Sequence, residues 1–77
     1  MLLESTESTR LEEELTQRIL ARTGRRVREL VIEVLPEGVV LRGQTTSWYI
    51  KQLAQHSVST LLPRVGVRNA ITVGGTA

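Results

Sequence analysis

The chain has 77 residues, of which 40% are hydrophobic and 23% are charged, a length that allows one small domain. It contains no cysteine, no aspartate and one histidine, which excludes disulfides, thiol nucleophiles, multi-histidine metal sites and a Ser-His-Asp triad. We therefore expect a non-enzymatic binding domain without a metal or cofactor. The net charge of +2 does not by itself indicate nucleic-acid binding.

The first predicted element is a helix over residues 9–23, which follows a polar segment, 1–8, that we expect to be flexible. Thr9 and Glu12 have the spacing of a capping box at the helix start. Apolar side chains recur every four residues on one side of this helix: Leu11, Leu15 and Ile19. Gly24 is typical of the position that follows a helix end.

Two strands joined by a tight turn are predicted next, at 27–35 and 39–42. β-branched residues dominate the first strand, and its alternation places one set of apolar side chains on a single face: Leu30, Ile32 and Val34. Pro36-Glu37-Gly38 is typical of a turn. We expect Gly43 to end the second strand and to permit the backbone turn into the next element.

A second helix is predicted over residues 48–62, with Ser47 as its N-cap and Pro63 as its stop. Its apolar stripe has helical spacing: Ile50, Leu53, Ala54, Ser57, Val58 and Leu61. The alternation from Val65 to Val73 predicts a third strand.

The order α-β-β-α-β predicts an α+β fold, a two-layer sandwich in which both helices cover one face of a three-stranded mixed sheet. We assign residues 9–73 to this single domain and 74–77 to a flexible tail. The second face of the sheet then stays open, and its side chains are mixed in character: Val31, Glu33, Leu35, Val40, Arg42, Arg68, Ala70 and Thr72.

One set of residues has an order and spacing that resemble the BON domain: Gly43, Ser47, Lys51 and Ala54, followed by the strand that contains Asn69. The resemblance covers residues 9–73. It implies a small bacterial module that binds phospholipid or attaches to an envelope protein partner, and family members are often periplasmic or envelope-associated. The chain as written shows no signal peptide, which predicts a cytoplasmic location. We interpret the motif residues as structural, with Asn69 bonding a neighbouring backbone group or interrupting an apolar row.

Five arginines fall within eleven residues, and they are the first candidate for a binding site: Arg18, Arg22, Arg25, Arg26 and Arg28. Guanidinium groups bind anionic headgroups or phosphates. The alternative is that they balance the dipole at the helix end, with Arg18 paired to Glu14 one turn earlier.

Trp48 and Tyr49 open the second helix and are the second candidate. On a helical wheel Trp48 lies opposite the apolar stripe, where it can insert at a membrane interface or anchor a partner. The alternative is that Trp48 folds back over residues 44–46 or the N-terminal segment. We expect His56 to be solvated and to have no catalytic role.

Three functions remain open from the sequence. The first is association with anionic phospholipid or an envelope protein partner through the arginines and the two aromatic residues. The second is self-association, as a homodimer or scaffold, through the open sheet face. RNA binding ranks last, because no Gly-x-x-Gly loop joins the helices and Gly74-Gly75 lies in the tail.

Overall fold

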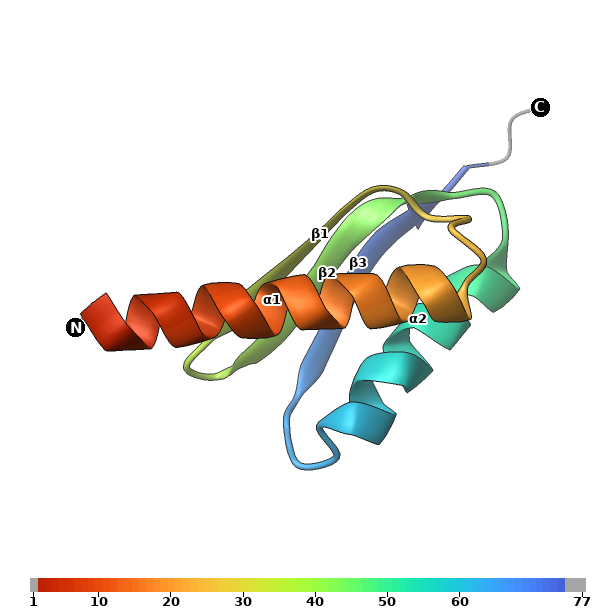
Figure 1. Ribbon diagram of the computed structural model, residues 1–77. Coiled ribbons are helices and arrows are strands. Elements are labelled where there is room, and N and C mark those ends of the chain that lie inside the picture. The colour runs from red at the N-terminus through yellow and green to blue at the C-terminus, as the bar shows by residue number, and fades with distance from the viewer. Residues whose placement is uncertain (1, 75–77) are drawn as a thin grey trace.

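The computed structural model describes residues 2–74 and the side chains from residue 9 onward. It contains two helices and three strands in the predicted order (Figure 1). The elements are α1 (Leu2–Arg22), β1 (Arg28–Leu35), β2 (Gly38–Thr45), α2 (Trp48–Leu61) and β3 (Val67–Val73). The predicted α+β class and the predicted order of elements are confirmed.

The sheet has the strand order β1-β2-β3, so β2 lies at its centre. β1 pairs with β2 antiparallel across the two-residue turn at Pro36-Glu37, and β3 pairs with β2 parallel after the crossover through α2. Both helices lie on one face of the sheet, as predicted (Figure 1). The carboxyl ends of β2 and β3 therefore meet at one edge of the domain, beside the connection that follows α1.

The core lies between the two layers. It is built from the apolar stripe of each helix, the helix-facing side of each strand and Val27 of the connection before β1: Leu15, Ile19, Val27, Ile32, Val39, Leu41, Ile50, Ala54, Val58 and Ile71. The predicted stripe of α2 is confirmed at its buried positions, but its last member, Leu61, is exposed and Leu62 packs against the core instead. Leu62 is the C-cap of α2, and its N–H donates to the carbonyl of Val58, so it follows the buried Ala54 and Val58 at four-residue spacing.

α1 begins at Leu2, so the predicted helix start at Thr9 is wrong and residues 2–8 continue the helix. No glycine or proline separates Leu2 from Thr9, and nothing in this stretch stops the helix from extending backward. Glu12 is thus not a capping-box residue: its Oε2 accepts a hydrogen bond of 2.9 Å from the backbone N–H of Val34. The predicted tail residues 75–77 lie outside the described part of the chain.

The other end of α1 matches the prediction. Gly24 has φ 64°, and the N–H of Arg25 donates to the carbonyl of Leu20 at 2.8 Å. A left-handed glycine with this hydrogen bond is the Schellman arrangement, which turns the chain away from the helix axis. It directs the segment after α1 toward the sheet edge.

β2 continues through Gly43 to Thr45, so Gly43 does not end the strand as predicted. A Cβ at this position would lie 2.9 Å from Cγ1 of Val27, 3.0 Å from the carbonyl oxygen of Arg28 and 3.3 Å from Cα of Leu30. Glycine is required here because β1 approaches β2 too closely for any side chain. The close approach coincides with an irregularity in β1, which is central to the candidate site.

Candidate functional site

The arginine cluster divides into two groups in the structure. Arg18 and Arg22 lie on the last turns of α1, where with Ala21 they flank a shallow hollow against α2. Arg18 is hydrogen-bonded to Glu14 at 3.5 Å, which is the pairing one helical turn apart that the sequence predicted as the alternative. These two residues are therefore separate from the remaining arginines, which follow the helix end.

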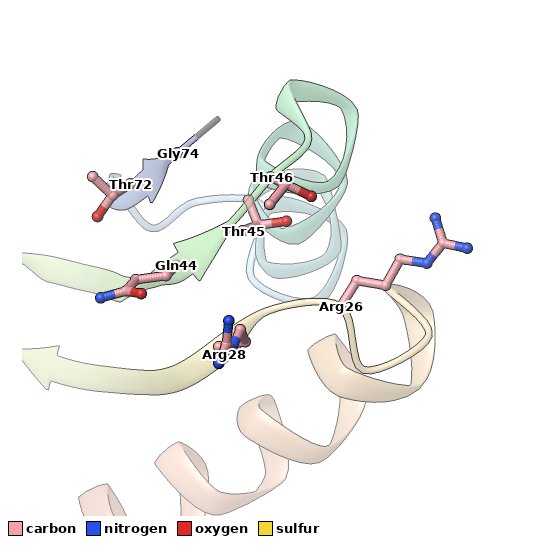
Figure 2. Close-up of a pocket in the computed structure, with 7 residues that line it drawn as sticks. All are labelled: Arg26, Arg28, Gln44, Thr45, Thr46, Thr72 and Gly74. Atoms are coloured by element: carbon pink, nitrogen blue, oxygen red, sulfur yellow. The ribbon is translucent and has the colours of Figure 1, made fainter. Parts of the chain in front are cut away.

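Arg26 and Arg28 line a pocket of about 320 Å³ at the edge where β2 and β3 end. The rest of its lining is polar or small: Gln44, Thr45, Thr46, Thr72 and Gly74. Figure 2 shows the guanidinium of Arg26 extended on the side toward which the hydroxyls of Thr45 and Thr46 point. Arg28 lies on β1 next to Gln44 on β2 in the same view.

A β-bulge places Arg28 in this pocket. Arg28 is paired with Gln44, whereas Val31 is paired with Arg42, so three steps along β1 match two along β2. In a regular strand, Glu29 would stand opposite Gln44. The bulge therefore exchanges an acidic side chain for a basic one at this position, and Glu29 adopts a left-handed φ of 53°.

Three side chains consequently form a row across the end of the sheet. Gln44 is the register partner of both Arg28 on β1 and Thr72 on β3. The hydroxyl of Thr72 donates to the carbonyl of Gly43 at 3.2 Å. The row is polar throughout, and it belongs to the open face of the sheet.

The two aromatic residues stand at the same end of the domain, where α2 begins (Figure 1). Trp48 is 65% exposed and Tyr49 is 67% exposed, so the prediction that Trp48 points outward is confirmed and the fold-back alternative is wrong. The ammonium of Lys51 lies 5.0 Å from the centre of the Trp48 ring, a cation–π contact that restrains the indole. His56 is exposed on the outer side of α2, as predicted.

The motif residues are mostly structural, as interpreted from the sequence. The hydroxyl of Ser47 accepts a hydrogen bond from the N–H of Ile50, and Ala54 is fully buried. Asn69 donates to the carbonyl of Lys51 at 2.9 Å, which ties β3 to α2. Its Oδ1 accepts from the N–H of Ile71 at 3.2 Å.

The open sheet face is less apolar than its composition suggests. Arg42 and Glu33 form an ion pair of 2.8 Å across it. Val40 is only 9% exposed, because its register partners, Glu33 and Arg68, flank it with long side chains. Val31, 53% exposed, is the large apolar side chain that this face presents to solvent.

Sequence reasoning missed the polar half of the pocket, namely Gln44, Thr45 and Thr46. One signal was present: parallel pairing of the second and third strands brings the residues that follow both strands to one edge. The bulge in β1 had no such signal, because simple alternation assigns Arg28 to the helix-facing side.

No helix among residues 2–74 is both long and apolar enough to cross a membrane. Comparison of the chain with protein-family models, curated proteins and solved structures finds no match. The resemblance to the BON domain therefore rests on the residues quoted for it.

Proposed function

We propose that this chain is a non-enzymatic binding module that associates with anionic phospholipid surfaces through the end of the domain where α1 stops and α2 starts. The observation that carries the proposal is the juxtaposition, at this one end, of exposed arginines with exposed aromatic rings. Arg25, Arg26 and Arg28 are all exposed, and α2 begins there with Trp48 and Tyr49. The resemblance to the BON family supports the same function.

The charges at this end are available to a partner. The two ion pairs within residues 9–74 engage Arg18 and Arg42, and neither involves the three arginines after α1. Each basic residue near an anionic leaflet contributes about 1 kcal/mol of attraction. Tryptophan and tyrosine prefer the boundary between headgroups and acyl chains, because their rings are apolar and their N–H and O–H groups are polar. Both contributions act at the same end of the domain, where α1 stops and α2 starts.

Co-sedimentation with phosphatidylcholine vesicles, with and without phosphatidylglycerol, tests the proposal. We expect binding only to the anionic vesicles, weakened by added salt because screening reduces the attraction. Trp48 is the single tryptophan, so a blue shift of its fluorescence on vesicle addition reports insertion of this end directly.

The sharpest variant is the triple substitution of Arg25, Arg26 and Arg28 by glutamine. Loss of three charges should weaken vesicle binding roughly a hundredfold, at about 1 kcal/mol each. A matched control replaces three exposed arginines elsewhere, Arg10, Arg64 and Arg68, by glutamine and changes the net charge equally. Equal losses in both triple variants, or no binding to anionic vesicles at low salt, would overturn the proposal.

A further inference from the structure

The pocket beside Arg28 is lined by hydrogen-bond donors and contains no carboxylate. Its seven lining residues are two arginines, three threonines, a glutamine and a glycine. Guanidinium groups offer planar sets of N–H donors, and hydroxyls and amides add further donors around them. Such a lining suits an oxyanion and offers no charge that would attract a cation.

The guanidinium groups of the pocket form no ion pair with the described residues. Arg26 and Arg28 take part in neither of the ion pairs found within residues 9–74. An arginine held beside a partner carboxylate would have to lose that partner before binding an anion. Here no such exchange is needed within the described residues.

Two of the three threonine hydroxyls at the pocket, those of Thr45 and Thr46, are also free to donate. The oxygen of Thr45 accepts from the N–H of Ser47 at 3.4 Å, which leaves its own O–H for another acceptor. Thr46 is exposed, and its hydroxyl points to the same side as the guanidinium of Arg26 (Figure 2). Thr72, in contrast, uses its proton on the carbonyl of Gly43. The α1–β1 connection and the β2–α2 connection therefore both contribute residues to the lining of this pocket.

The β-bulge that brings Arg28 to this pocket places the next residue, Glu29, in an unfavourable backbone conformation. The bulge keeps Arg28 opposite Gln44 and removes Glu29 from that position. In exchange, Glu29 adopts a left-handed conformation, which is unfavourable for a residue with a side chain. The fold thus places the positive charge of Arg28 at the end of the sheet, and the neighbouring Glu29 adopts an unfavourable backbone conformation as a result.

We propose that this pocket binds a phosphate group, with Arg28 and Arg26 as the charged contacts and the hydroxyls of Thr45 and Thr46 as neutral donors. The volume of about 320 Å³ suits a small anionic headgroup or a soluble phosphate ester. The inference deepens the proposed function and rests on it for the lipid source of the phosphate. The pocket chemistry is the same for either source, so the test separates them.

The first arm follows backbone amide shifts by NMR during titration with inorganic phosphate, against sodium chloride at the same ionic strength. We expect saturable shifts at Arg28, Gln44 and Thr46 with phosphate only. Arg28→Gln should weaken this binding about tenfold, because one charge-assisted contact is lost. Arg26→Gln, in the exposed connection, serves as a second variant should Arg28→Gln unfold the domain. Arg64→Gln is the matched control and should bind phosphate as the unsubstituted chain does.

The second arm repeats the measurement with phosphatidylglycerol vesicles. Pocket shifts that both arginine variants abolish identify the lipid headgroup as the source. Saturable phosphate binding without vesicle binding supports the pocket, assigns it to a soluble phosphate ester and refutes the proposed function. Identical shifts with chloride, or phosphate binding that neither arginine variant weakens, overturn the pocket inference. If the pocket inference fails in this way but vesicle binding persists, the proposed function still holds through the other residues at this end, Arg25, Trp48 and Tyr49.

Discussion

Among residues 2–74, Glu29 and Arg25 are the residues other than glycine with a positive φ, and Glu29 is the one that lies in a strand. Its φ of 53° lies in the left-handed region, where a side chain costs about 1–2 kcal/mol. Glycine removes that strain but loses more conformational freedom on folding, by about 0.5–1 kcal/mol. We therefore predict that Glu29→Gly raises the free energy of unfolding by about 1 kcal/mol, measured by urea denaturation.

Glu29→Gln is the control for this substitution, because it removes the charge and keeps the side chain. It should leave stability within about 0.5 kcal/mol of the original. A glycine variant that is no more stable than the glutamine variant would show that the bulge is not strained.

Gly43 is the complementary residue on the partner strand. An added Cβ meets two backbone atoms of β1, the carbonyl oxygen of Arg28 at 3.0 Å and Cα of Leu30 at 3.3 Å. Backbone in a paired strand cannot move aside without disturbing the bulge. We predict that Gly43→Ala lowers the free energy of unfolding by about 2–3 kcal/mol in urea denaturation and weakens phosphate binding.

Gly74 offers a matched comparison, since a Cβ there meets nothing within 4 Å. Gly74→Ala should change stability by less than about 0.5 kcal/mol. Equal effects of the two substitutions would mean that β1 and β2 are not held in close contact at Gly43.

At the scale of the elements, each edge strand has an outward N–H group that is bound by a side chain. On β1, the outward N–H of Val34 is bound by Glu12 of α1. On β3, the outward N–H of Ile71 is bound by the side chain of Asn69. Unpaired N–H groups at a sheet edge invite pairing with another chain, so these contacts favour a discrete domain.

The Glu12 contact carries a prediction for α1. Glu12→Ala should lower the free energy of unfolding by about 1 kcal/mol, because the N–H of Val34 loses its acceptor. Hydrogen exchange at Val34 should accelerate in the same variant. Glu13→Ala makes the same change of charge and helix propensity at an exposed neighbouring position, and it should leave that exchange rate unaltered. Unchanged exchange in both variants would contradict the edge contact.

The elements also show which parts of the architecture the sequence predicts. α2 and its Ser47 cap follow from local rules, because the cap hydroxyl and the apolar stripe act within a few residues. The role of Glu12 and the end of β2 depend on contacts distant in sequence. Glu12 bonds a strand 22 residues away, and Gly43 is required by the approach of β1. The same reason explains why only part of the candidate site was predicted. Its arginines are close together in the sequence, whereas its threonines are brought to the pocket by the pairing of strands.

At the scale of the whole molecule, the open sheet face decides between a binding module and a self-associating one. A stable dimer interface has an apolar centre, yet the ion pair of Arg42 with Glu33 crosses this face. Val40 is already shielded, and Val31 alone offers a large exposed apolar side chain on these strands. The two edges are closed at Val34 and Ile71 by Glu12 and Asn69.

We therefore predict that the protein sediments as a monomer over a wide range of concentration in analytical ultracentrifugation. The reason is that one valine buried against its copy contributes only about 1.5–3 kcal/mol, which does not offset the freedom lost on association. Val31→Glu should leave the sedimentation coefficient unchanged, because no partner covers that side chain. A dimer that this substitution dissociates would instead establish the open face as an interface and make self-association the leading function. A monomer would instead favour binding through the end of the domain with Arg25, Arg26 and Arg28, which form no ion pair within residues 9–74.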